Sequence, residues 1–316
     1  MVLIDLRPVD ADRPDAAGEY ALHLTGALVK LAVHTDLTVV EPGFRGPLPA
    51  GETLLLPAGG NPVPGYRCLT AVHVLAPLRA GLLGFGGRFR AAFAASRSAV
   101  VIAPSEAVAD ALVRYLRVPA ARVALVPPGL EPGFTRTSRE EAAAARTRLG
   151  VPDRYLLAYG DARLARRAWK GAVTPAGAGL VMAADLAASP DRLAALLSGA
   201  IGVLFCEPLN GCPIRALQAM ACGSPPVVPD DGAFPEVVRD GGLTVRAGRI
   251  EDWSDAISAL YRSAPLRAQL LERGREIAGT FSADAAARRV LALLEGGQVA
   301  DEEQRKSAGD ADHVES

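Results

Sequence analysis

Cysteine and net charge are both scarce in this chain, and each shortage excludes a class of function. The 316 residues include 34 basic and 35 acidic side chains, which leaves a formal net charge of −1. A chain with balanced charges offers no broad basic face to a phosphate backbone, so nucleic-acid binding is not expected as its main task. A small ligand fits this composition better.

The four cysteines are too few and too widely spaced for a metal or disulfide scaffold. Cys68 stands alone, and Cys206, Cys212 and Cys222 follow one another at spacings of six and ten. These spacings match neither a CxxC metal pair nor a dense disulfide framework. We therefore expect buried free thiols and a reducing, cytoplasmic location. No acidic dyad that would hold a metal-bridged diphosphate stands out, so no metal is expected.

The chain also lacks the apolar segments of a secreted or membrane-spanning protein. Its first residues, "MVLIDLRPVDADRP", carry Asp5 and Arg7 inside a strand-like run and show no cleavage-site pattern, so no signal peptide is expected. No run of about 18 apolar residues occurs, which argues against a spanning helix. Peripheral membrane contact is compatible with these features. The sequence does not indicate whether the protein is a monomer or an oligomer.

What the chain does contain is a regular alternation of short leucine-rich or β-branched runs with alanine-rich helical stretches. Strands are predicted at 2–6, 37–42, 53–57, 68–74, 99–105 and 122–129, and then at 155–161, 179–184, 202–207, 225–230 and 243–248. Helices of the second half are predicted at 190–198, 213–222, 252–262 and 265–279. This alternation is typical of parallel sheets built from βα units.

Two Rossmann-like, doubly wound α/β domains are therefore expected, at 1–135 and 136–297, followed by a disordered polar tail at 298–316. Ser105 is predicted to cap the helix that follows it, and the helix over 139–150 ends on Gly150, where a C-terminal glycine belongs. In such folds the ligand lies beyond the carboxyl ends of the strands, here in a cleft between the domains.

Several segments, in order along the chain, carry motifs of one known family. "IDLRPV" and "AAGEY" are similar to the family's "IDARPL" and "GIGRY" runs, and "TAVHV" to its strand-end "HD" dipeptide. "VIAPSEAVADAL" is similar to its "VxxxSxxxxxxL" segment and "RVALVPPGLEPGF" to its "IPNGVDxxxF" segment. "PPVVPDDGAFPEVVRDGGLTVRAGRIEDWSDAI" nearly matches its C-terminal signature. Together these segments resemble the family 4 retaining glycosyltransferases of the GT-B fold.

The resemblance covers most of residues 1–297 and implies a division of labour between the two domains. The first domain would hold an acceptor, which remains unidentified, and the second would bind a nucleotide-diphosphate sugar as donor substrate. No further cofactor is implied. Two departures bear on activity. Between Gly171 and Gly179 the chain has only "AVTPAGA", so about one βα unit is expected to be missing, and the family's E-x₇-E acidic pair falls on Asn210 and Gln218.

The segment "NGCPIRALQAMACGSP" at 210–225 is predicted to be a loop that leads into a helix pointing at the donor diphosphate. Pro213 suits a first helical turn, and Gly211, followed by Cys212, allows the backbone to approach a ligand closely. The positive end of the helix attracts the diphosphate. Gln218 would meet the ribose, where an amide in place of a carboxylate weakens binding by about 1 kcal/mol. The alternative is a solvated glutamine.

Cations follow the glycine turn at Gly160, and the resemblance places them near the diphosphate. They are Arg163, Arg166 and Lys170, and Arg166 stands about where the family has lysine. Arginine can bind a phosphate through two hydrogen bonds. The alternative is that these side chains only solvate a loop. Glu236 in "FPEVV" resembles a residue near the nucleotide, although complementing a helix dipole explains this glutamate equally well.

Three side chains are candidates for the chemical step. Asn210 would meet the transferred sugar, where the lost carboxylate removes negative charge that favours a developing oxocarbenium ion. Glu207 could replace that acid if its loop bends inward, or it could be an exposed acid at a strand end. His73, at a strand end facing the cleft, could bind a sugar hydroxyl or position the acceptor, or it could be a structural histidine.

The expected function is transfer of a sugar from a nucleotide-diphosphate sugar to an acceptor, with retention of configuration. The two amides and the shortened second half favour an alternative, a catalytically impaired glycosyltransferase-like protein that acts as a binding or partner subunit. A nucleotide-sugar epimerase of related fold agrees less well with the transferase-type signature.

Overall fold

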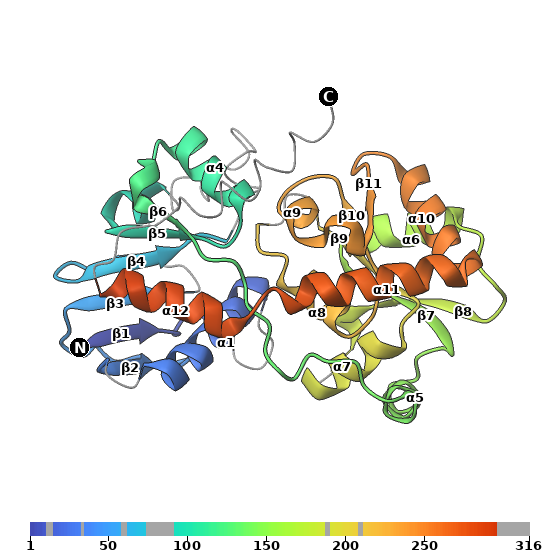
Figure 1. The fold of residues 1–316 in the computed structure, drawn as a ribbon, viewed down its shortest axis with the longest axis horizontal. Coiled ribbons are helices and arrows are strands. Elements are labelled where there is room, and N and C mark those ends of the chain that lie inside the picture. The colour runs from blue at the N-terminus through green and yellow to red at the C-terminus, as the bar shows by residue number, and fades with distance from the viewer. Residues whose placement is uncertain are drawn as a thin grey trace.

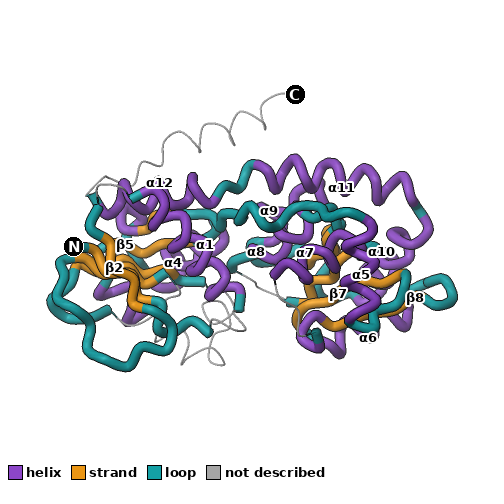
Figure 2. Tube along the Cα trace, turned by 90° about the horizontal axis from the view of Figure 1, so that it is seen from below, coloured by secondary structure: helices purple, strands orange, loops and turns teal. Residues whose placement is uncertain are grey.

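The computed structural model describes residues 1–10, 15–32, 35–57, 62–73, 92–186, 190–207 and 211–295. Within these ranges the chain forms two lobes, each built on a parallel sheet (Figure 1). Helices lie on the faces of both sheets, as the view turned by 90° also shows (Figure 2). The polar tail predicted at 298–316 lies outside the described residues.

The first lobe contains a six-stranded sheet within the described ranges, with the strand order β2-β1-β3-β4-β5-β6. Its strands are β1 (Val2–Asp5), β2 (Leu37–Val40), β3 (Thr53–Leu56), β4 (Arg67–Ala71), β5 (Val100–Ala103) and β6 (Val123–Leu125). The helices α1 (Ala16–Leu31) and α4 (Glu106–Leu116) pack against it, and a 3₁₀ turn covers Ala120–Arg122. The predicted strands are present, each shorter at its carboxyl end.

The second lobe contains a five-stranded sheet in the part of the chain described, in the order β11-β10-β9-β7-β8. Its strands are β7 (Arg154–Gly160), β8 (Ala178–Met182), β9 (Gly202–Cys206), β10 (Pro226–Pro229) and β11 (Leu243–Val245). Its helices are α5 (Arg139–Arg148), α6 (Ala162–Gly171), α7 (Pro190–Gly199), α8 (Ile214–Ala221), α9 (Phe234–Val238), α10 (Ile250–Arg262) and α11 (Ala264–Gly279). Short 3₁₀ turns cover Ala183–Asp185 and Arg239–Gly241. The predicted elements of this half are present to within a few residues.

The second sheet is one strand shorter, at its β8 edge, than the usual doubly wound order of six strands, as far as the structure describes it. The sequence predicts a missing unit after Gly171. In the structure α6 and β8 stand on either side of "AVTPAGA", and β8 is followed by α7 and β9. The shortfall therefore lies after β8, because α6 already completes the crossover from β7 to β8.

The last helix, α12 (Ala283–Leu294), returns to the first lobe and runs along α1 (Figure 1). Ala287 and Val290 of α12 are fully buried in the same core as Leu24 and Leu28 of α1. The expected boundary, which assigns all of 136–297 to the second domain, is therefore wrong for α12. Its apolar stripe completes the core of the first domain, so the chain crosses between the domains twice.

All four cysteines are buried thiols, as the sequence predicts. Burial is the main cause that raises the pKa of Cys206 and of Cys212 to about 12, so both remain protonated at neutral pH. Among the described residues, no helix is both long and apolar enough to cross a membrane.

Candidate active site

Each sheet has one place where the order of its strands reverses. In the first sheet this switch point lies between β1 and β3, and in the second it lies between β7 and β9. Doubly wound proteins bind ligands beyond the carboxyl ends of the strands at such a point. The residues that follow β7 and β9, together with the start of α8, therefore form the candidate crevice of the second domain, which we call the donor crevice.

Gly160 lets the ends of β7 and β9 approach closely at the donor crevice. Its φ angle is +83°, and a Cβ added there would lie 2.4 Å from the carbonyl oxygen of Cys206 and 2.5 Å from Cγ of Glu207. A side chain would be strained by the backbone angle and would also collide with β9. The glycine turn consequently holds Glu207, which is half-buried, beside the switch point.

The cations predicted for the diphosphate lie on a helix and not on a loop. α6 begins directly after the turn, where the carboxylate of Asp161 accepts a hydrogen bond of 2.7 Å from the backbone N–H of Arg163. Arg163, Arg166 and Lys170 are exposed, on the helix side opposite the fully buried Ala165. The acid directly after Gly160 takes up the first free N–H groups of α6, which a diphosphate would otherwise need.

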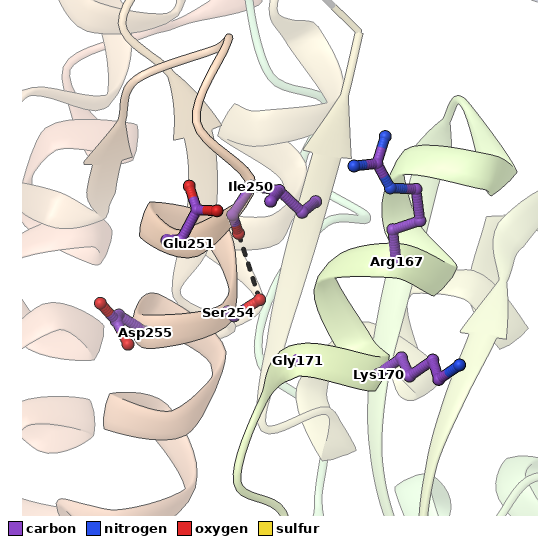
Figure 3. A pocket seen from close by; sticks show the side chains of 7 residues that line it. All are labelled: Arg167, Lys170, Gly171, Ile250, Glu251, Ser254 and Asp255. Atoms are coloured by element: carbon purple, nitrogen blue, oxygen red, sulfur yellow. Dashed lines mark hydrogen bonds between the residues drawn. The ribbon is translucent and has the colours of Figure 1, made fainter.

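Lys170 is placed away from the donor crevice, contrary to the prediction. It lies in the last turn of α6, about 12 Å along the helix axis from the first turn. With Arg167 it lines one wall of a pocket of about 500 Å³, whose other wall carries Glu251 and Asp255 of α10 (Figure 3). Ser254, between the walls, donates its hydroxyl proton toward carbonyl oxygens of α6 and α10. This pocket belongs to the outer helices of the second domain.

The start of α8 is buried in the interface between the domains. A Cβ on Gly211 would lie 2.4 Å from the backbone oxygen of His73, and the Gly211 carbonyl accepts a 2.8 Å hydrogen bond from the Ser105 hydroxyl. Ser105 also caps α4, as predicted. Cys212 and Ile214 pack into the core of the first domain. The helix end that the sequence directs at a diphosphate is therefore covered by the first domain.

Two side chains of α8 hold one carboxylate of α1. Arg215 donates from Nε to Oε1 of Glu19 at 3.0 Å, and Gln218 donates from Nε2 to Oε2 of the same carboxylate at 3.1 Å. Burial raises the pKa of Glu19, while Arg215 and Gln218 act in the opposite direction. Gln218 is only 1% exposed, which excludes the solvated alternative. Its Oε1 has no hydrogen-bond partner in the described part of the chain.

Glu19 and Arg215 were not among the predicted site residues, although the sequence contained a signal. Glu19 stands where the resembling "GIGRY" run has arginine, and Gln218 is a position at which the resemblance implies an acid. Each departure looked isolated in sequence, because 199 positions separate the two residues. In the structure they face each other across the contact between α1 and α8.

His73 is buried at the end of β4, beside the donor crevice. Its Nε2 lies 2.6 Å from the carbonyl oxygen of Pro57, which can only accept, so Nε2 carries the proton. Burial lowers the pKa of His73, despite the opposing effect of that carbonyl, and favours the neutral ring. Nδ1 is then an acceptor, buried and without a partner among the described residues. The ring also meets the edge of Tyr20, with centroids 4.7 Å apart.

Glu236 reaches the first domain at the start of α4 and not at the start of α8. Its carboxylate accepts hydrogen bonds from the backbone N–H groups of Glu106 at 2.9 Å and Ala107 at 3.4 Å. Burial raises its pKa to about 7, although those N–H groups act in the opposite direction. Glu236 therefore complements the positive end of a helix dipole, which is the alternative given for it above, but the helix is α4 of the other domain. Glu236 also lines an interdomain pocket of about 690 Å³ with Ser105 and Arg239.

Asn210, the position predicted to meet the transferred sugar, lies outside the described residues. The described part of the site brings together His73, Gly211, Cys212 and Gln218 at the interface, and Gly160 with Glu207 at the neighbouring strand ends. It separates Lys170 and Glu236 from them. The site is therefore smaller than the predicted one and is centred on α8.

Two Rossmann-like domains that close over such a crevice, with the last helix returning to the first domain, define the GT-B fold. Solved glycosyltransferase structures share this fold. The structure of Anabaena Alr3699/HepE in complex with UDP and glucose matches with a TM-score of 0.71 and 13% identity, over 93% of this chain and 99% of that one. WaaG, a glycosyltransferase involved in lipopolysaccharide biosynthesis, matches with a TM-score of 0.67 and 16% identity, over 94% and 100%.

Sequence comparisons find similarity to glycosyltransferases over part of the chain. Residues 186–277, which include α8 and the strands on either side of it, match the family described as Glycosyl transferases group 1. A D-inositol 3-phosphate glycosyltransferase from Actinosynnema mirum is 30% identical over 61% of this chain and 56% of its own length. The chain thus spans about half the length of that relative.

Proposed function

We propose that this protein is a glycosyltransferase that moves a sugar from a nucleotide-diphosphate sugar to an acceptor with retention, without a metal or other cofactor. The observation that carries the proposal is the position of Gln218. It lies on α8, at the switch point of the second domain, inside the segment that matches the group 1 family. Its buried Oε1 is an acceptor that a ribose hydroxyl would satisfy.

The remaining site residues take roles that follow from their geometry. In a bound complex, Gly160 and the first turn of α8 would lie against the diphosphate, with the positive end of the helix dipole directed at it. His73 would accept a hydrogen bond on Nδ1 from a hydroxyl of the acceptor or of the transferred sugar, since Nε2 is already engaged. Glu207, half-buried beside Gly160 at the end of β9, would supply a carboxylate that stabilises the anomeric centre.

Retention requires that the new bond forms on the face from which the leaving group departs. The bond between the anomeric carbon and the phosphate oxygen breaks, and the acceptor oxygen bonds to that carbon from the same side. The acceptor proton passes to the departing phosphate oxygen, so no strong protein base is required. The neutral His73 ring agrees with such a role, because it would orient a hydroxyl without having to remove its proton.

The acceptor is proposed from the relatives alone. The protein from Actinosynnema mirum is named for action on D-inositol 3-phosphate, so a phosphorylated cyclitol is the first acceptor to test. The chain spans about half of that relative, so its acceptor does not follow from the relative's name. A panel of other hydroxyl acceptors therefore belongs in the same assay.

One set of observations favours the alternative, a catalytically impaired binding or partner subunit. The start of α8 is covered by the first domain, Gln218 is engaged by Glu19, and the second sheet, within the described ranges, is short by one strand. The cover over α8 and the contact with Glu19 both lower access to a donor. A subunit of this kind would bind nucleotides weakly and transfer no sugar.

The experiment that separates the two functions titrates UDP-sugars and GDP-sugars by calorimetry and then assays transfer with every donor that binds. The proposed function predicts binding and sugar transfer. Binding without transfer would support the partner subunit, and binding of no nucleotide would exclude both. The double substitution Asn210→Glu and Gln218→Glu, made together with Glu19→Ala so that no two buried carboxylates face each other, restores the family's acids and should increase transfer. Glu272→Gln, an exposed position on α11, is the control.

A further inference from the structure

In the contact between Glu19 and α8, two side chains of α8 donate hydrogen bonds to a single carboxylate. Arg215 and Gln218 lie one turn apart on the same helix face, and each donates to a different oxygen of Glu19. Each of the two partners also has contacts within its own domain. The Arg215 guanidinium lies 5.2 Å from the centre of the Tyr159 ring, and Glu19 stands in the first turn of α1, which Asp15 caps. Both partners are therefore held in place by their own domains.

The contact with Glu19 occupies the hydrogen-bond donors of α8 that a ligand would need. Gln218 is the residue proposed to meet the ribose, and its amide N–H now points at a carboxylate of the opposite domain. A ligand hydroxyl or phosphate cannot approach these two donors while Glu19 holds them. Diphosphate would also meet the negative charge of Glu19 at short range, so the two are mutually exclusive occupants of the start of α8.

We propose that Glu19 is a latch that closes the donor crevice by taking the place of the donor on Arg215 and Gln218, and that it thereby sets the affinity for the donor. The proposal rests on the proposed function for the identity of the ligand. The latch itself rests only on the contacts between α1 and α8. Nucleotide binding then requires that the domains separate at this contact before the ligand enters.

The size of the effect follows from the population of the open form. Apparent affinity falls in proportion to the fraction of molecules that are competent to bind. Two charge-assisted hydrogen bonds that hold the closed form reduce that fraction by roughly tenfold or more. Glu19→Ala should therefore tighten the binding of a nucleoside diphosphate by about tenfold or more, because it removes the competitor and leaves the donors of α8 in place.

The test measures opening and binding separately. Spin labels on Asp110→Cys of α4 and Glu272→Cys of α11, both exposed, report the distance between the domains by pulsed electron resonance. Glu19→Ala should shift this distance distribution to longer values and tighten UDP binding by calorimetry. Glu19→Gln preserves the shape of the side chain if the alanine variant folds poorly. Glu140→Gln, an exposed position on α5, is the control.

An unchanged distance distribution in both Glu19 variants would overturn the latch, whatever the nucleotide result. Weaker UDP binding in the variants would overturn it as well, because Glu19 would then be a ligand contact. Opening of the domains in variants that bind no UDP or GDP would uphold the latch and overturn the proposed function instead. The two failures are thus distinguishable in one set of proteins.

Discussion

The stability of this protein should depend on pH through Glu236, which joins the two domains at the start of α4. Burial raises its pKa from an ordinary 4.5 to about 7. Because the folded pKa lies above the unfolded one, the folded state keeps a proton between these values that the unfolded state has already lost. The contribution of this group is therefore fully present at low pH and is lost as the pH rises toward 7.

The magnitude follows from the difference between those two pKa values. At 1.36 kcal/mol per pKa unit, it corresponds to about 3 kcal/mol, and solvent near this partly exposed side chain reduces it to roughly 1–3 kcal/mol. Glu236→Gln keeps the shape and an acceptor for the N–H of Glu106, but it cannot ionise. Variant and wild type should be about equally stable near pH 5, whereas the variant should be more stable at pH 8 by that amount.

Urea unfolding at several pH values between 5 and 8 measures this difference, with Glu272→Gln as an exposed control on α11. The control should follow the wild-type profile throughout. A stability difference between Glu236→Gln and wild type that stays constant over the whole pH range would contradict a raised pKa of Glu236. It would mean that the carboxylate is not buried against α4 in solution.

Two further predictions test the packing that shapes the site. Leu293→Ala on α12 should lower the free energy of unfolding by about 2–5 kcal/mol and speed hydrogen exchange in the first sheet. Leu270→Ala on α11 should instead speed hydrogen exchange in the second sheet. The same exchange pattern in both variants would contradict the packing of α12 on the first domain. Gly211→Ala places a Cβ 2.4 Å from the His73 carbonyl oxygen. It should lower the free energy of unfolding by about 1–3 kcal/mol, or separate the domains and so increase the radius of gyration measured by X-ray scattering. An unchanged radius of gyration and an unchanged stability would exclude the close contact.

The strands and helices of the fold could be predicted because they depend on local sequence patterns. The strands and helices follow from apolar periodicity and from caps such as Ser105, which act within a few residues of the chain. The return of α12 could not be predicted in this way. Its small buried residues, Ala287 among them, fit either domain by sequence, and only packing against α1 decides between them.

The site was predicted less completely than the fold, because it is built from contacts between distant parts of the chain. The turn at Gly160 and the helix beginning near Gly211 follow from glycine and proline positions. The partners of that helix do not, since Glu19 and His73 come from the other domain. The prediction for Lys170 includes no helix after Gly160, whereas in the structure α6 carries its last residues away from the turn.

The most direct test of the proposed function is incubation of the protein with UDP-sugars and GDP-sugars and a panel of acceptors that includes D-inositol 3-phosphate, followed by NMR. The spectra report both the release of nucleoside diphosphate and the configuration of the new bond. The proposed function predicts release that depends on an acceptor, a product with the configuration of the donor, and faster release in Glu19→Ala than in wild type. It would be contradicted if none of the three proteins, wild type, Glu19→Ala and the variant with both acids restored, bound or consumed a nucleotide sugar.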